Sequence, residues 1–298
     1  MEYRKLGKSD LSVSRIGFGT MSLEISNPLS ENILLRALEG GINYFDTADL
    51  YNQGMNEALL GGVFREKRDQ IVLCTKVGNQ WRADGSGWDW VPTKKYILSA
   101  VDQSLKRLQT DFIDLYQLHG GTLEDPIDDI IEAFELLKVA GKIRYYGISS
   151  IRPNVIREYV KRSSIISVMM QYSLLDRRPE EDMLSFLYDN QVAVLARGTI
   201  AKGLLVSKPA ASYLNYSEDQ VAAVNRQIIK VSSHDRSPAA TAIHFVLENP
   251  AITSAVIGIR TEQQLTDALN SVQIKPPGKE ELEKLKNSIP VSYYTNNR

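Results

Sequence analysis

The chain has 298 residues, of which 43% are hydrophobic and 24% are charged, and its 35 basic residues nearly balance 36 acidic ones. This composition is typical of a globular protein and argues against a nucleic-acid or anionic-membrane partner. The chain has no run of about 18 apolar residues, the length that would predict a membrane span, and its N-terminus lacks the apolar core of a signal peptide. We therefore expect a cytoplasmic protein.

Short apolar segments rich in β-branched residues alternate along the chain with longer segments of helical period. The predicted strands are 15–20, 42–47, 71–76, 112–119, 143–150, 166–174, 192–198 and 252–258. The predicted helices are 30–41, 55–67, 93–108, 127–141, 154–162, 179–191, helical material up to about 249, and 261–271. Ser30 is expected to cap the first helix, since Glu31 follows it in the first turn.

The number of strand–helix pairs indicates the fold. Eight such pairs, with no compositional break between them, predict a (β/α)8 TIM barrel, an α/β fold, as a single domain over residues 1–298. The alternative is a doubly wound nucleotide-binding fold, which needs Gly-x-Gly-x-x-Gly after its first strand. Gly17 and Gly19 fit that pattern, but Ser22 stands in the third position. The strand count therefore favours the barrel.

In such a barrel, the active site lies at the C-terminal ends of the strands. Polar residues occupy those ends or the loops just beyond them: Asp46, Tyr51, Lys76, His119, Ser149, Ser150, Gln171 and Arg260. Each has an ordinary structural explanation when taken alone, such as a turn cap, a surface aromatic, a solvent-facing lysine or a core histidine. Their concentration at one end of the barrel favours a functional site.

Cysteine and histidine usage excludes other kinds of site. The single cysteine, Cys74, cannot form an intrachain disulfide, and its apolar neighbours predict a buried thiol rather than a nucleophile. This cysteine usage also suits the cytosol. The 3 histidines have no ligand-type spacing, so we expect no metal site.

Four of the strand-end residues form a chemical set. A phenol is a weak acid at neutral pH, and a nearby ammonium ion such as Lys76 is expected to lower the pKa of Tyr51. Asp46 would hold Lys76 charged and in place. His119 would orient a carbonyl oxygen by a hydrogen bond. The set predicts a proton donor for a carbonyl oxygen.

Six segments then resemble, in order and spacing, those of the aldo-keto reductase superfamily. They are GGINYFDTADLY, LCTKV, SLKRLQTDFIDLYQLH, GKIRYYGISS, MQYSLLDR and VIGIRTEQQL. The resemblance covers nearly the whole chain. It implies an oxidoreductase that binds NADP(H) across the barrel mouth and interconverts a small carbonyl substrate and its alcohol without a metal. It does not specify the oligomeric state.

The resemblance also implies residue roles. Tyr51 matches the proton donor, and Asp46, Lys76 and His119 match its supporting partners. Ser149, Ser150 and Gln171 match groups that bind the nicotinamide carboxamide. The expected cofactor contacts also include Gly19, Thr20, Met21, Arg197, Gly258, Arg260 and Gln264. Among these, Arg260 and Gln264 are expected to bind the 2′-phosphate, because they lie at the start of the last predicted helix.

Some positions depart from the family pattern. Arg197 stands where many members have an aromatic residue that stacks on the nicotinamide, and a planar guanidinium can also stack. Asn52 follows Tyr51 where many members have glycine. Gly120 and Gly121 follow His119, which suggests a wider pocket. The loop 79–90 carries all 3 tryptophans, Trp81, Trp88 and Trp90, as candidates to line it.

Two other functions compete with carbonyl reduction. Lys76 could form a Schiff base in an aldolase that needs no nicotinamide. Alternatively, the barrel could sense bound NADP(H) for a partner protein without catalysis. Arg260 and the predicted carboxamide-binding residues Ser149, Ser150 and Gln171 argue against the aldolase. The intact set of Asp46, Tyr51, Lys76 and His119 argues against the sensor.

Overall fold

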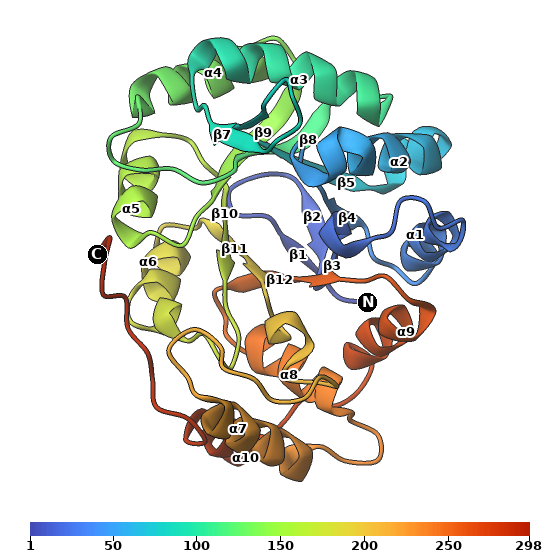
Figure 1. The fold of residues 1–298 in the computed structure, drawn as a ribbon, viewed down its shortest axis with the longest axis vertical. Helices are drawn as coiled ribbons and strands as arrows, with labels where there is room; N and C mark the ends of the chain where they lie inside the picture. The colour runs from blue at the N-terminus through green and yellow to red at the C-terminus, as the bar shows by residue number, and fades with distance from the viewer.

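A closed ring of parallel strands forms the centre of the protein, as a computed structural model of residues 1–298 shows (Figure 1). The strands are β3 (Ile16–Gly19), β4 (Tyr44–Asp46), β5 (Val72–Val77), β8 (Ile113–Leu118), β9 (Ile143–Ser149), β10 (Ser167–Gln171), β11 (Ala193–Arg197) and β12 (Ile252–Gly258). Neighbours in the ring follow chain order, and β12 pairs with β3 to close it. The predicted (β/α)8 barrel and its eight strands are confirmed.

Helices surround the ring as predicted, and one more helix, at residues 279–286, was not predicted. They are α1 (Leu29–Glu39), α2 (Met55–Phe64), α3 (Lys94–Leu108), α4 (Ile127–Val139), α5 (Pro153–Arg162), α6 (Met183–Asp189), α7 (Glu218–Val231), α8 (Pro238–Leu247), α9 (Glu262–Ser271) and α10 (Lys279–Lys286). The capping role expected for Ser30 is wrong. Ser30 lies inside α1, whose N-cap is Pro28, and its hydroxyl donates to the Glu24 carbonyl at 2.6 Å.

The core has two layers because strand residues alternate between the barrel interior and the surrounding helices. The interior layer includes Tyr44, Cys74 and Leu115. Leu6 and Leu11 join this layer from the turn of an N-terminal hairpin, β1 (Tyr3–Lys5) and β2 (Ser12–Ser14), which was not predicted. This hairpin fills one end of the barrel, so the polar strand ends lie at the other. Cys74 is fully buried, as expected.

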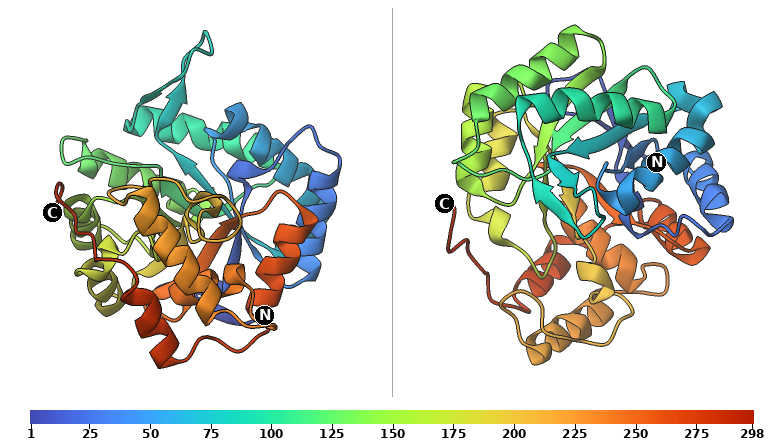
Figure 2. Two further views of the ribbon diagram at one scale, coloured as in Figure 1. Left: turned by 60° about the horizontal axis from the view of Figure 1, so that its bottom comes forward. Right: turned by 45° about the horizontal axis from the view of Figure 1, so that its top comes forward.

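The tryptophan loop forms a second unpredicted hairpin, β6 (Asn79–Trp81) and β7 (Trp88–Trp90), which projects from the barrel in Figure 2, where it is teal. Trp90 anchors it: the indole donates to Asp125 at 3.0 Å, and the ring packs where a Cβ on Gly78 would come within 2.5 Å. The Trp81 indole donates to the Leu50 carbonyl at 3.1 Å. Trp88 remains 48% exposed. Two of the three tryptophans therefore hold the hairpin in place.

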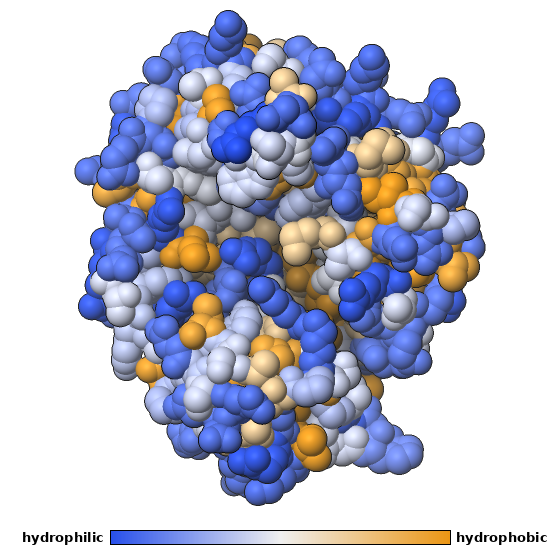
Figure 3. All heavy atoms as spheres, in the orientation of Figure 1, coloured by the Kyte–Doolittle hydropathy of each residue, from blue (hydrophilic) through white to orange (hydrophobic).

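The surface seen in Figure 3 is mostly hydrophilic, with hydrophobic residues in small separate groups. None of the helices is both long enough and apolar enough to cross a membrane.

Candidate active site

Asp46, Tyr51, Lys76 and His119 meet at the open end of the barrel. Asp46 ends β4, Lys76 lies in β5 and His119 directly follows β8, while Tyr51 begins the 3-10 turn η2 (Tyr51–Gly54). The Lys76 ammonium donates to Asp46 Oδ2 at 2.7 Å, to the Thr47 carbonyl at 2.8 Å and to Tyr51 Oη at 3.4 Å. The His119 ring meets the Tyr51 ring edge-on, with centroids 5.8 Å apart. The structure thus brings the four predicted residues together.

The turn after Tyr51 explains one departure from the family pattern. Asn52 and Gln53 have φ angles of 46° and 54°, and Gly54 has 85°, so three successive residues adopt the left-handed conformation. Glycine adopts this conformation readily and asparagine tolerates it better than most residues. Asn52 therefore keeps the backbone shape that a glycine would allow. Its side-chain amide also donates to Asn56 at 2.7 Å.

Burial sets the electrostatics of the pair Lys76–Asp46. Lys76 is 0% exposed and Asp46 is 4% exposed. Burial alone acts against the charge on Lys76, but the Asp46 carboxylate and Tyr51 outweigh it, so the pKa of Lys76 is raised. Burial also raises the pKa of Asp46, although Lys76 opposes this rise. We regard the two as an ion pair, because the ammonium has two close oxygen acceptors.

The pKa values of Tyr51 and His119 follow from the same buried setting. Burial raises the pKa of Tyr51, and Lys76 offsets only part of the rise. The expected net lowering of the Tyr51 pKa is therefore wrong, although the effect of Lys76 has the predicted sign. Burial, with Lys76 and Arg197 nearby, lowers the pKa of His119 to about 3. The His119 imidazole is thus neutral at neutral pH and can donate a hydrogen bond.

The residues predicted to contact a cofactor also lie on this face. Gly19, Ser149, Gln171, Arg197 and Gly258 are the last residues of β3, β9, β10, β11 and β12. Ser150 follows β9, and Thr20 and Met21 form the 3-10 turn η1 (Thr20–Ser22). The parallel ring explains this arrangement, because all its strands end at the same side.

Two residues that sequence reasoning missed hold this face together. Tyr213, in the loop after β11, accepts a hydrogen bond from Gln171 Nε2 at 3.1 Å, and Arg197 donates to the Gln171 oxygen at 3.1 Å. Asn56, 1% exposed, donates to the Thr20 carbonyl at 2.7 Å. Neither position had a sequence signal beyond an aromatic or polar residue near a predicted helix or loop.

Arg260 and Gln264 meet at the start of α9. Thr261 caps this helix by accepting from the Gln264 backbone at 3.2 Å, and the Gln264 side-chain oxygen accepts from the Arg260 backbone at 3.0 Å. The Gln264 amide nitrogen remains available as a donor. Arg260 is exposed, and its guanidinium forms no ion pair with the protein. This helix start therefore offers donors suited to an anion.

Comparisons with known proteins agree with this geometry. The model of the Aldo/keto reductase family matches residues 15–289. The chain is 46% identical over 307 aligned residues to the uncharacterized oxidoreductase YqkF of Bacillus subtilis (strain 168), with 100% of both chains covered. It is 30% identical over 297 residues to aldo-keto reductase YhdN of that organism, covering 91% of this chain and 88% of YhdN. The holo form of aldo-keto reductase AKR11C1 from Bacillus halodurans matches with a TM-score of 0.94 and 46% identity, covering 100% of this chain and 99% of that one. The chain therefore belongs to the aldo/keto reductase family and is an oxidoreductase of that type.

Proposed function

We propose that this protein is an NADPH-dependent carbonyl reductase that reversibly reduces an aldehyde or ketone to an alcohol, with Tyr51 as the proton donor. The observation that carries the proposal is the position of Lys76 Nζ, 2.7 Å from Asp46 Oδ2 and 3.4 Å from Tyr51 Oη. A phenol held beside a buried ammonium ion can give its proton to a carbonyl oxygen, because the ammonium stabilises the phenolate that remains.

Residues of the protein would transfer the proton to the substrate and orient it. Tyr51 Oη gives its proton to the substrate oxygen as the alcohol forms. Lys76 stabilises the resulting phenolate, and Asp46 keeps Lys76 charged. The neutral His119 donates a hydrogen bond to the same substrate oxygen and so fixes its position. The bound nicotinamide supplies the hydride for the carbonyl carbon.

Several features of the site fit a nicotinamide cofactor. Asp46 Oδ1 and Thr47 Oγ1 are buried at the barrel mouth without a protein partner, as polar groups beside a ligand would be. Ser149, Ser150 and Gln171 would bind the carboxamide, and the Arg197 guanidinium would stack on the ring. Gly19, Thr20, Met21 and Gly258 would line the path of the cofactor between the ends of β3 and β12.

The choice of NADPH over NADH depends on Arg260. Its exposed guanidinium, the N-terminus of α9 and the Gln264 amide would together bind the 2′-phosphate. Names of relatives do not decide the choice. A Schizosaccharomyces pombe relative is named aldo-keto reductase yakc [NADP(+)], whereas an Escherichia coli relative is named NADH-specific methylglyoxal reductase.

The electrostatics disfavour the aldolase alternative. A Schiff-base lysine attacks a carbonyl carbon as the neutral amine, and enzymes that use one lower its pKa. Asp46 has the opposite effect here, because it raises the pKa of Lys76. A cofactor-sensing role without turnover would use the same site, so the activity test separates it from catalysis.

The test is a screen of NADPH oxidation over aldehydes, ketones and dicarbonyls, with the parent and the Tyr51→Phe variant. We expect turnover in the parent and a loss of about 10²–10⁴-fold in Tyr51→Phe, because a positioned general acid contributes about that much. The NADPH dissociation constant should change little, since the variant removes only the hydroxyl.

Three outcomes would count against the proposal. Turnover of Tyr51→Phe within about threefold of the parent would remove Tyr51 as proton donor. Tight NADPH binding without turnover over the whole panel would favour the sensor. Borohydride trapping of a substrate on Lys76 in the absence of cofactor would favour the aldolase.

A further inference from the structure

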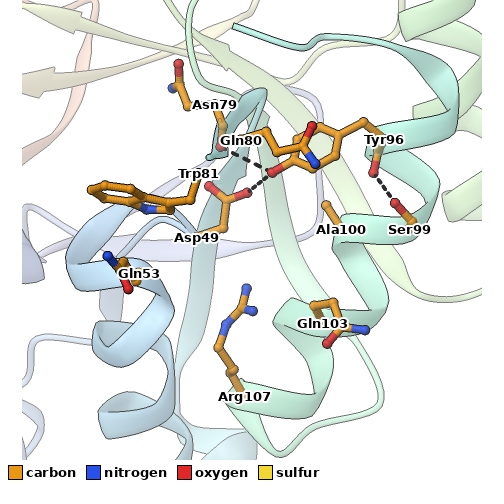
Figure 4. A pocket seen from close by; sticks show the side chains of 10 residues that line it. All are labelled: Asp49, Gln53, Asn79, Gln80, Trp81, Tyr96, Ser99, Ala100, Gln103 and Arg107. Carbon is orange, nitrogen blue, oxygen red and sulfur yellow. Dashed lines mark hydrogen bonds between the residues drawn. The ribbon is translucent and has the colours of Figure 1, made fainter. Parts of the chain in front are cut away.

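A cavity of about 460 Å³ lies beside the active site, between the β6–β7 hairpin, the turn η2 and α3 (Figure 4). None of the four residues Asp46, Tyr51, Lys76 and His119 lines it. The volume is within the range of about 300–1,000 Å³ that is usual for small-molecule sites. The proposed carbonyl reduction makes no use of this cavity.

Besides Asn79, one other buried polar residue lines the cavity, Asp49. It is 8% exposed, and in Figure 4 it lies between Trp81 and Tyr96. Its Oδ2 accepts from the Tyr96 hydroxyl at 3.4 Å, whereas its Oδ1 is buried without a hydrogen-bond partner. Buried polar atoms usually have a partner, and leaving one unpaired costs free energy. The unpaired oxygen therefore indicates a place for a hydrogen-bonding group from outside the chain.

The other walls carry groups that both donate and accept hydrogen bonds. Gln53, Gln80 and Gln103 come from three different elements, and all are exposed. Arg107 adds donors, although Glu57 already binds its guanidinium at 2.6 Å. The Trp81 ring offers a flat apolar surface, and its indole bond to the Leu50 carbonyl at 3.1 Å holds it in position.

These groups discriminate between classes of ligand. An ammonium ion only donates hydrogen bonds, so it would leave the N–H groups of the glutamine amides unpaired. A phosphate only accepts hydrogen bonds, so it would leave the three glutamine side-chain oxygens without a donor. A hydroxyl both donates and accepts, so each one can pair with an amide or with Asp49 Oδ1.

We propose that this cavity is a second ligand site, separate from the barrel mouth, that binds a small polyhydroxy compound such as a sugar or cyclic polyol. The hydroxyl groups bind the three glutamine amides and Asp49, and the C–H face of the ring packs on Trp81. Burial and the nearby Glu57 raise the pKa of Asp49 to about 8. At neutral pH its carboxyl group is therefore mostly protonated, and the cavity carries little net negative charge.

The site adjoins the proposed catalytic segment through the backbone. The Asp49 N–H donates to the Lys76 carbonyl at 3.3 Å, and Asp49 precedes Tyr51 by two residues. A ligand on Asp49 thus contacts the segment that carries Tyr51 without entering the barrel.

The experiment measures binding of myo-inositol and D-glucose to the full chain by saturation-transfer NMR, with n-butylammonium and inorganic phosphate as comparison probes. We expect saturable binding of at least one polyol and none of the comparison probes. Gln103→Leu and Asp49→Asn should each weaken polyol binding by about two- to tenfold, the usual effect of one lost hydrogen bond. Gln227→Leu, on α7 across the barrel, is the matched control and should bind as the parent does.

Gln103 is exposed on α3, so Gln103→Leu tests the site even if Asp49→Asn does not fold. Equal polyol affinity in Gln103→Leu and the parent would overturn the proposal. The absence of saturable polyol binding, or preferential binding of n-butylammonium or phosphate, would do the same. Competition between polyol and NADPH would also overturn it, because that result places the polyol in the barrel mouth.

Discussion

Lys76 connects the parts of the proposed proton donor. It is the only one of the four residues with hydrogen bonds to two others, Asp46 and Tyr51. Burial raises the pKa of Tyr51, and Lys76 is the largest influence that lowers it. The readiness of the phenol to exchange a proton therefore depends on this one ammonium group.

We predict that Lys76→Met shifts the pH profile of alcohol oxidation upward. In that direction Tyr51 must accept a proton, and without Lys76 its pKa is raised further by burial. The measurement is kcat/KM for oxidation against pH in both proteins, with NADP⁺ binding as the control for folding. A profile identical to that of the parent would show that Lys76 does not act on Tyr51.

The buried position of His119 predicts that this residue does not titrate in the pH range where the enzyme is assayed. Its pKa of about 3 keeps the imidazole neutral across the working range. The pH profile of carbonyl reduction should therefore show no step near pH 6–7, where an ordinary histidine titrates. A step in that range that disappears in His119→Gln would contradict the neutral assignment.

We predict that Arg260→Ala weakens NADPH binding by about 10- to 100-fold and barely changes NADH binding, because a hydrogen bond to a charged group contributes about 1.5–3 kcal/mol. Both dissociation constants can be measured by fluorescence titration. Arg226→Ala, an exposed arginine on α7, is the matched control. Equal losses for both cofactors would mean that Arg260 does not bind the 2′-phosphate.

Sequence reasoning identified the residues of the site better than their energetics. Asp46, Lys76 and His119 were predictable because the ends of parallel strands meet at one face. The net direction of the Tyr51 pKa was not, because it depends on how deeply the ring is buried, which the sequence does not reveal. Tyr213 was missed for a related reason, since its contact with Gln171 spans 42 positions and depends on the path of a loop.

At the level of elements, α2 and α3 pack so closely that they leave no space for a side chain at Gly61. A Cβ there would lie 2.4 Å from the Arg107 carbonyl oxygen and 2.6 Å from the Leu108 carbonyl carbon. Both atoms belong to the backbone and cannot rotate away. At the next residue, Gly62, a Cβ would meet nothing within 4 Å. The two glycines differ in packing, although both are in α2.

We predict that Gly61→Ala lowers the free energy of unfolding by about 1–3 kcal/mol, the usual cost of overpacking. Gly62→Ala should raise it by about 0.5–1 kcal/mol, because alanine favours a helix over glycine. Urea unfolding of the three proteins provides the measurement. A stabilised Gly61→Ala would mean that α2 and α3 are further apart than the structure has them.

The elements that were predicted belong to the repeating strand–helix pattern, and even β4, with only 3 residues, was predicted from it. The barrel strands and their helices repeat a pattern long enough to show its period, and their observed bounds lie within a few residues of the expected ones. The hairpins β1–β2 and β6–β7 have strands of only 3 residues, too short for an alternating pattern to show. The tryptophans of β6–β7 were noticed, but their anchoring depends on Gly78 and Asp125, which tertiary packing brings into contact.

For the whole molecule, Asp49 links folding stability to pH. Its pKa in the folded protein, about 8, is above its ordinary value of 3.8, chiefly because of burial. A carboxyl group with a raised folded pKa contributes stability that is fully present below pH 4. That contribution is lost as the pH rises toward 8, because the unfolded chain ionises first.

We predict that the parent loses stability between pH 5 and pH 8.5 relative to Asp49→Asn, by more than about 1 kcal/mol, since one pKa unit corresponds to about 1.4 kcal/mol. The measurement is urea unfolding of both proteins at the two pH values. Asp235→Asn, at an exposed position, is the control and should follow the parent. A constant difference between the parent and Asp49→Asn would show that Asp49 titrates normally.

The position of β12 in the ring has a consequence for synthesis of the protein on the ribosome. β12 pairs with β11 on one side and with β3 on the other, so the first and last barrel strands are neighbours. Until Ile252–Gly258 has emerged, the nascent chain has no partner for either strand edge, and such edges favour aggregation. The barrel therefore closes only after β12 has emerged, and until then the unpaired edges of β3 and β11 can associate with other nascent chains.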